Sequence, residues 1–269
     1  MGDLVILKIG GSVITDKDKP FTLRRETLER LSLEISRGYR RLGKKLILVH
    51  GAGSFGHPIV SETQIHKGIS RPEQLLAFAE TQRWQNHLNT LVTEILQGRG
   101  LPAMPCQASS FSIMEEGRLV WMPLDTIKGF LELGLIPVLY GVPAYDRVQG
   151  CSILSGDQIA PYLARELGAE RIIHGTDVDG VYTDDPHLNP DATLIPEINE
   201  ENIEEVIKHL KASFHIDVTG GMLGKIRELW KLAEIGIESE IINADKEGLV
   251  EKALAGERRL GTIIKAKTK

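Results

Sequence analysis

The sequence predicts an α/β fold, a three-layer αβα sandwich built around a mainly parallel central sheet. Short, continuously apolar runs such as Leu4–Ile9 indicate strands that are buried on both faces. Longer stretches with helical spacing of their apolar residues alternate with these runs along the chain. Strands that alternate with helices are typical of a parallel sheet that helices cover on both sides.

Each expected element rests on one apolar run or one amphipathic stretch. We expect strands over residues 4–9, 46–49, 101–106, 136–140, 171–174, 239–242 and 262–264. We expect helices over residues 27–39, 73–96, 157–167 and 225–235, where apolar residues recur on one side. No internal repeat or obvious linker interrupts this order. We therefore expect one continuous sheet with two lobes, residues 1–167 and 168–269.

Composition and charge exclude several classes of protein. The 269 residues are 42% hydrophobic and 26% charged, which is ordinary for a globular protein with a substantial core. The formal net charge of −5 does not suggest a nucleic-acid partner. No run approaches the roughly 20 apolar residues of a membrane span, and the first residues do not resemble a signal peptide. Two cysteines without metal-type spacing fit a reducing cytoplasm, where we expect the protein.

Glycine-rich stretches follow several of the expected strands. They are residues 10–12, 51–56, 155–157 and 175–180, and a further pair, Gly220 and Gly221, precedes a helix. In sheets of this class, ligands bind beyond the carboxyl ends of the strands. One glycine stretch marks a turn, but several at one sheet edge predict backbone amides gathered round an extended anion.

Residues 51–56, GAGSFG, match the G-x-G-x-x-G pattern of dinucleotide-binding proteins by letter. That interpretation requires the first strand of a βαβ unit before the glycines, and an acidic residue ending a strand about 20 residues later. Here the motif follows the second strand, and Leu76 at that distance lies inside the long expected helix. A Walker P-loop is also absent from the sequence. We therefore favour a glycine loop for a different phosphate.

Three lysines and one aspartate stand out among the charged residues near the glycine-rich stretches. Lys8 interrupts an apolar strand, and either its flexible stem reaches solvent or it points a cation at phosphate beside the following glycines. Lys17 lies in a polar turn, where a solvated loop charge is the simple alternative. Lys225 lies near a helix start, where a bound anion would explain a cation that the helix dipole does not favour. Asp157 opens a helix, where its alternative role is a first-turn acid or cap.

Five blocks along the chain carry a resemblance to a known family. They are LKIGGSVIT, ILVHGAGSFGH, residues 153–164, GTDVDGVYT and DVTGGMLGKI, in this order. Together they resemble the amino acid kinase superfamily, and within it the isopentenyl phosphate kinases of the archaeal type, from Leu4 to Gly261. The resemblance implies the amino acid kinase fold and a homodimer. It also implies ATP-dependent phosphorylation of isopentenyl phosphate to isopentenyl diphosphate, with Mg²⁺.

The resemblance further implies roles for individual residues. Lys8 and Lys225 would bind the ATP phosphates, Lys17 would stabilise the transition state, and Asp157 would orient Lys8 and Lys225. His57 would donate a hydrogen bond to the acceptor's phosphate, because a histidine can carry charge near neutral pH beside a dianion. The implied nucleotide site also contains Gly10, Gly11, Ser12, Gly53, Asp177, Tyr182 and Gly221. The implied acceptor site also contains Ala52, Gly53 and Gly156.

Three points stay open in the sequence. Taken alone, His57 before Pro58 is an ordinary loop histidine. The helix over residues 73–96 is expected to wall an apolar pocket for the hydrocarbon tail, with Phe78 and Trp84 either on its floor or in the core. Residues 141–146 depart from the Gly-Asp of relatives, and no carboxylate pair indicates a magnesium cage. We therefore assign no acceptor role there and no metal ligand.

Two other kinds of function are compatible with the sequence. A kinase of the same superfamily could act on a phosphonate antibiotic such as fosfomycin, on glutamate or on uridylate. The phosphonate also carries a dianionic group, which His57 does not exclude. The alternative from another class is a nucleotide-binding regulatory protein without turnover, but such a protein has no need of Lys8, Lys17 and Lys225 together.

Overall fold

The chain folds around an eight-stranded sheet. The computed structural model describes residues 3–184, 189, 191–213 and 221–267, and the strand order in this sheet is β12-β14-β13-β9-β1-β2-β6-β3. The first strand, β1 (Leu4–Ile9), lies inside the sheet and pairs in parallel with β2 (Lys45–His50) and β9 (Arg171–Thr176). The chain thus places β2 on one side of β1 first and β9 on the other side later. This reversal of strand order creates a topological switch point at the carboxyl end of β1.

Parallel pairing continues on both sides of this centre. β6 (Ile136–Tyr140) and β3 (Ala103–Pro105) follow β2, and β13 (Glu238–Asn243) follows β9. At the far edge, β14 (Thr262–Ile264) runs antiparallel to β13, and β12 (Glu197–Ile198) pairs in parallel with β14. The mainly parallel sheet is therefore confirmed, and each expected strand is present with its ends within two residues of expectation.

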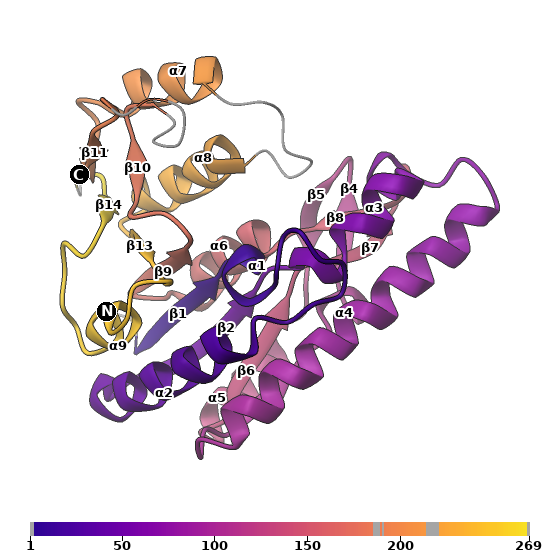
Figure 1. Cartoon of the computed structure of the whole chain (residues 1–269), viewed down its shortest axis with the longest axis horizontal. Coiled ribbons are helices and arrows are strands. Elements are labelled where there is room, and N and C mark those ends of the chain that lie inside the picture. Colours follow the sequence, from indigo (N-terminus) through magenta and orange to yellow (C-terminus); the bar gives the residue numbers. More distant parts are fainter. Residues whose placement is uncertain (1–2, 185–188, 190, 214–220, 268–269) are drawn as a thin grey trace.

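Helices cover both faces of the sheet, which confirms the three layers (Figure 1). Alternate residues of β1 show the two sides, because Leu4 and Ile6 pack into one apolar cluster while Val5 and Leu7 pack into another. The helices of the first cluster include α5 (Asp125–Glu132), α6 (Gly156–Leu167) and α8 (Gly221–Ala233). Those of the second cluster include α2 (Arg25–Leu42), α4 (Glu73–Gln97) and α9 (Leu249–Leu254). Burial on both faces explains the continuously apolar strands.

A second, smaller sheet has no counterpart among the expected elements. Its order is β5-β4-β7-β8, and it lies beside α3 (His57–Thr63) at one end of the molecule (Figure 1). These strands gave no clear signal because they are short, β5 is mostly exposed, and β7 contains Pro143. Their bounds are β4 (Ile113–Glu115), β5 (Arg118–Trp121), β7 (Val142–Asp146) and β8 (Gly150–Leu154).

The small sheet corrects one part of the predicted glycine pattern. Residues 155–157 follow β8 of this sheet rather than a strand of the central sheet. Gly175 lies within β9, not after it, and Gly221 is the first residue of α8. The other elements not expected from the sequence include α3, α5, α9 and β12. They also include α1 (Gly11–Ile14), α7 (Ile203–Ser213), the hairpin of β10 (Val181–Tyr182) and β11 (Leu194–Ile195), and short 3₁₀ turns.

The long helix α4 buries several polar side chains where it crosses the small sheet and the glycine loop. Thr81, Gln85 and Asn89 are almost completely buried, and Asn89 Nδ2 lies 3.0 Å from His50 Nε2 at the end of β2. This polar stripe turns α4 into a rigid support for the loop that follows β2. Among the residues that the structure describes, no helix combines the length and apolar character needed to cross a membrane.

Candidate active site

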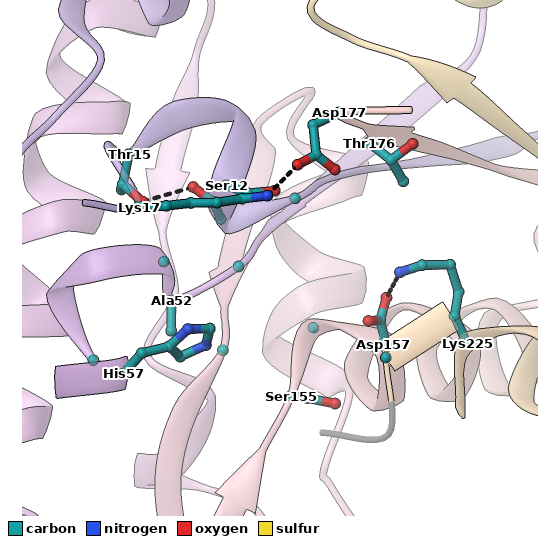
Figure 2. A pocket seen from close by; sticks show the side chains of 18 of the residues that line it. Ser12, Thr15, Lys17, Ala52, His57, Ser155, Asp157, Thr176, Asp177 and Lys225 are labelled. Atoms are coloured by element: carbon teal, nitrogen blue, oxygen red, sulfur yellow. Dashed lines mark hydrogen bonds and ion pairs between the residues drawn. The ribbon is translucent and has the colours of Figure 1, made fainter. Parts of the chain in front are cut away.

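A cavity of about 1110 Å³ lies at the carboxyl ends of β1, β2 and β9, where the switch point predicts a ligand. It is large enough for two small-molecule substrates at once. Figure 2 shows part of its lining. Every site residue named from the sequence lines this cavity: Lys8, Gly10, Gly11, Ser12, Lys17, Ala52, Gly53, His57, Gly156, Asp157, Asp177, Tyr182, Gly221 and Lys225.

Lys8, Asp157 and Lys225 form one ion-paired cluster in this cavity. Lys8 Nζ lies 2.9 Å and Lys225 Nζ lies 2.7 Å from the same oxygen, Asp157 Oδ1. Lys8 lies near the end of β1 on the face of Leu4 and Ile6, so it points toward α6 and α8, which carry Asp157 and Lys225. Its side chain is only 7% exposed, which contradicts the alternative of a lysine reaching solvent. Asp157 does lie in the first turn of α6, but it also holds both cations.

The cluster changes the proton affinity of its members. Burial raises the pKa of Asp157, but the ammonium groups of Lys225 and Lys8 outweigh burial and hold that pKa well below its ordinary value. Burial lowers the pKa of Lys225 to about 8, with Asp157 opposing the shift and Lys8 adding to it. The cluster therefore presents two cations and one carboxylate at neutral pH. Its net positive charge suits a phosphate ligand.

Lys17 lies apart from this cluster, at the exposed side of the cavity. Its side chain is 63% exposed, and its Nζ lies 2.5 Å from Asp177 Oδ2 in the loop after β9 (Figure 2). Burial raises the pKa of Asp177, but the hydrogen bond and charge of Lys17 outweigh it and lower that pKa. Lys17 is thus mostly exposed and is held by an ion pair across the cavity.

The glycines after β1 and β2 allow two loops to pack backbone against backbone. A Cβ atom on Gly11 would lie 2.3 Å from the Gly53 nitrogen, and one on Gly51 would lie 2.4 Å from the Gly11 nitrogen. Gly53 has a φ of +51°, and a Cβ there would lie 2.0 Å from Thr15 Oγ1. Thr15 Oγ1 donates to the Gly11 carbonyl at 2.8 Å and accepts from the Ser54 amide at 3.0 Å. Gly51 and Gly53 of the G-x-G-x-x-G pattern thus allow this close packing of the two loops.

His57 lies at the opposite side of the cavity from the lysine cluster. It is the exposed first residue of α3, and its ring lies beside Ala52 (Figure 2). Apolar side chains from α3 and the small sheet line the cavity near this region: Pro58, Val60, Val142, Pro143 and Ile153. The site therefore has one cationic end and one end that combines a histidine with apolar surface.

Phe78 and Trp84 of α4, which the sequence offered as a possible floor of the apolar pocket, do not line the cavity. Of the described α4 residues, Thr81 and Gln85 line the cavity, but Phe78 and Trp84 do not. Phe78 packs behind the wall with the apolar cluster of Val60, and Trp84 stacks on Phe21 with ring centroids 4.2 Å apart. The core alternative for both aromatic residues is therefore correct. Helical spacing could not show which apolar residues of α4 face the cavity and which face the core, because α4 packs against more than one apolar cluster.

Several cavity residues were not identified from the sequence. Gly141 at the end of β6 donates its amide to the His50 carbonyl at 2.9 Å, and it faces Ala52 and Gly156 closely. Its position after an expected strand was the signal that could have found it. Thr15, Ser155 and Thr176 lie inside segments that the sequence singled out but were not named individually. Gln85 gave no signal, because only the fold brings it to the cavity. Of the block DVTGGMLGKI, the structure describes residues 221–226, and Gly220 lies outside the described part.

Two of the acidic residues that line the cavity, Asp157 and Asp177, are already engaged. Asp157 pairs with two lysines, and Asp177 pairs with Lys17. Over the part of the chain that the structure describes, no group of three or more metal-binding side chains comes together. Any divalent cation in this cavity would depend on the ligand for most of its oxygen partners.

Comparison with known proteins agrees with this architecture. The sequence profile of the amino acid kinase family matches residues 3–243. The isopentenyl phosphate kinase of Methanothermobacter thermautotrophicus is 44% identical over 98% of this chain and 100% of its own, and that of Methanocaldococcus jannaschii is 38% identical over 94% and 96%. A solved structure of isopentenyl phosphate kinase, 42% identical, superimposes with a TM-score of 0.84 over 97% of this chain and 100% of that one. The chain belongs to the amino acid kinase family.

Proposed function

We propose that the protein transfers the γ-phosphoryl group of ATP to isopentenyl phosphate, which yields isopentenyl diphosphate and ADP for isoprenoid biosynthesis. The observation that carries the proposal is one cavity with a buried lysine cluster at one end and His57 with apolar surface at the other. The relatives named isopentenyl phosphate kinase match over nearly the whole chain, which supports the same substrate pair.

The cationic end is assigned to the nucleotide. Lys8 and Lys225 bind the phosphates of ATP, and Asp157 holds both ammonium groups in place before the nucleotide arrives. Backbone at Gly10, Gly11, Ser12, Gly53 and Gly221 allows close approach of the phosphates. Asp177 and Tyr182 lie on the loop and strand after β9, where they contact the nucleoside side. In terms of the two lobes, residues 168–269 supply the nucleoside contacts and residues 1–167 supply the acceptor site.

The opposite end is assigned to isopentenyl phosphate. His57 donates to the acceptor phosphate, which lies against Ala52, Gly53 and Gly156. The hydrocarbon tail occupies the apolar surface of Val60, Val142 and Ile153. A five-carbon tail gains from this surface in proportion to the apolar area that it buries.

The chemistry needs charge stabilisation more than proton transfer. An oxygen of the acceptor phosphate attacks the γ-phosphorus, the bond to the β-phosphate oxygen breaks, and ADP leaves with that electron pair. The attacking oxygen is already ionised at neutral pH, so no general base is required. Lys17, held on an exposed loop across the cavity, neutralises the charge of the transferred group in the transition state.

Mg²⁺ enters this scheme as part of the nucleotide substrate. Asp157 and Asp177 pair with lysines, and the described residues bring together no group of three metal-binding side chains, so the phosphate oxygens and water supply most of its ligands. The ion would neutralise part of the phosphate charge. The protein groups orient the nucleotide that carries it.

The surroundings of the enzyme complete the proposal. Cys106 and Cys151 are buried and not disulfide-bonded, which supports a cytoplasmic enzyme. The family resemblance supports a homodimer, which light scattering coupled to gel filtration tests as a mass near twice that of the chain. Neither nucleic acid nor a membrane is needed as a partner.

An acceptor panel tests the function. ATP and Mg²⁺ are incubated with isopentenyl phosphate, dimethylallyl phosphate, fosfomycin, uridylate or glutamate, and ADP release and the phosphorylated product are both measured. The highest kcat/KM is expected with isopentenyl phosphate. Preference for fosfomycin, uridylate or glutamate would replace the proposed acceptor, and nucleotide binding without turnover of any of them would indicate a regulatory protein.

A further inference from the structure

His174 lies beneath the lysine cluster, and the proposed mechanism does not yet use it. It is in β9, its Cα pairs with that of Lys8 on β1, and its side chain is completely buried. Both ring nitrogens lack a hydrogen-bond partner in the described structure. A neutral imidazole carries one N–H and one lone pair, so the ring buries a donor and an acceptor that both go unused.

This ring lies close to the carboxylate that holds the two lysines. His174 Nδ1 lies 3.7 Å from Asp157 Oδ1, the oxygen that already accepts from Lys8 and Lys225. That distance is too long for a hydrogen bond, but a shift of less than 1 Å would bring it into the usual range. Burial and the nearby ammonium groups lower the pKa of His174 well below its ordinary value, so the ring is neutral.

A second buried histidine of the same sheet, His50, has a polar partner for each of its ring nitrogens. His50 Nδ1 lies 3.0 Å from the Gly51 carbonyl oxygen, and its Nε2 lies 3.0 Å from Asn89 Nδ2. Burial lowers the pKa of His50 to about 4, so it is neutral as well. Both rings are thus buried and uncharged, but only His174 has both nitrogens free beside a charged cluster. An unused buried donor costs stability, so a purely structural role does not explain it.

We propose that His174 is a positioning residue: its Nδ1–H donates to Asp157 Oδ1 when the nucleotide phosphates draw Lys8 and Lys225 away from that oxygen. In the free enzyme Asp157 has two ammonium donors and needs no third. When the phosphates compete for these donors, the carboxylate would lose them in a buried site. The histidine replaces part of that interaction and keeps the carboxylate of Asp157 in place. The inference rests on the proposed nucleotide site.

Three substitutions at one position separate this role from a packing role. His174→Asn keeps an amide donor close to the Nδ1 position, His174→Gln moves the amide to the Nε2 position, and His174→Leu removes the donor. We expect the Leu and Gln variants to bind ADP about 10- to 100-fold more weakly, because a hydrogen bond to a charged group is lost in the bound state. The Asn variant should bind within a few-fold of the original chain. The Leu variant should not lower the melting temperature of the free protein, because it removes an unsatisfied donor.

Calorimetric titration with ADP and thermal melts without ligand give the result. Equal ADP affinity of the Leu variant and the original chain would overturn the proposal, as would equal losses in the Asn, Gln and Leu variants. A lower melting temperature of the Leu variant with unchanged ADP affinity would assign the histidine to packing alone. Lys225→Ala, titrated in parallel, tests the nucleotide site itself. If it binds ADP as the original chain does, the proposed nucleotide site fails, and not only the role of His174.

A measurement on the original chain covers the case in which a variant does not fold. Ring ¹⁵N signals of His174 are recorded with and without ADP. We expect the proton on Nδ1 in the bound form and a shift of that signal when ADP binds. A ring signal that ADP leaves unchanged, or a proton on Nε2 in the bound form, would contradict the proposal.

Discussion

The two ends of the cavity are built in different ways. At the cationic end, Lys8 and Lys225 are 7% and 8% exposed and share one carboxylate that a helix presents to the sheet. At the acceptor end, His57 is exposed on the first turn of a seven-residue helix, and the wall comes from a small sheet outside the central one. The first end is organised before any ligand binds, whereas the second is assembled from short elements.

This difference corresponds to two tasks, binding of nucleotide phosphates and selection of the acceptor. Nucleotide phosphates need fixed positive charge, which the central sheet and two helices supply with little freedom. Choosing an acceptor needs a local polar contact and a shaped apolar wall, which short elements can change without disturbing the core. Lys17 belongs to neither end, because it is exposed and held by one ion pair across the cavity.

The largest effect should follow removal of the carboxylate at the cationic end. Asp157→Ala leaves two buried ammonium groups without their partner, so the free energy of unfolding should fall by about 3–5 kcal/mol. Urea denaturation near pH 7 measures this loss. The loss should be smaller at pH 9, because Lys225, with a pKa of about 8, is then mostly neutral. A variant as stable as the original chain at both pH values would show that the cluster is not organised before binding.

Lys17 should affect the rate more than binding. Lys17→Met removes a cation needed mainly in the transition state, so kcat should fall by about 10²- to 10³-fold with little change in KM for either substrate. Steady-state kinetics with both substrates varied gives these constants. Lys19→Met is the matched control, because Lys19 lies in the same turn, is 72% exposed and does not line the cavity. An effect of Lys17→Met confined to KM would place the lysine in ground-state binding instead.

His57 should affect only the acceptor. His57→Ala removes one charged hydrogen bond, so kcat/KM for isopentenyl phosphate should fall by about 10- to 100-fold while the KM for ATP stays the same. His87→Ala is the control, since His87 is an exposed histidine of α4 outside the cavity lining. An unchanged kcat/KM in the His57 variant would remove this histidine from the acceptor site.

The smallest effect concerns pH. Lys225 is charged below its pKa of about 8 and neutral above it, so ADP binding should weaken as pH rises above 8, by at most about tenfold per pH unit. Calorimetry from pH 6.5 to pH 9.5 measures the slope, with pH values chosen on both sides of that pKa. Lys225→Arg keeps its charge over this range and should flatten the profile. The same pH dependence in the Arg variant would assign it to another group.

The sequence predicted the central sheet well and the small sheet not at all, for a physical reason. Strands such as β1 and β6 are buried on both faces, so their apolar runs are continuous and easily recognised. β5 is short and mostly exposed, and β7 contains Pro143, so the local pattern could not reveal them. At the site, motifs identified Lys8, Asp157 and Lys225, which the fold then brought onto one oxygen. No motif points to His174, because what distinguishes it is that both of its ring nitrogens lack a hydrogen-bond partner in the described structure.

Binding of each substrate to each end tests the account most directly. ADP and isopentenyl phosphate are titrated separately into the original chain, His57→Ala and Lys225→Ala, and six dissociation constants are compared. We predict that His57→Ala weakens isopentenyl phosphate binding alone and that Lys225→Ala weakens ADP binding alone. A variant that weakens both ligands equally, or one whose loss falls on the opposite ligand, would contradict the division of the cavity into a nucleotide end and an acceptor end.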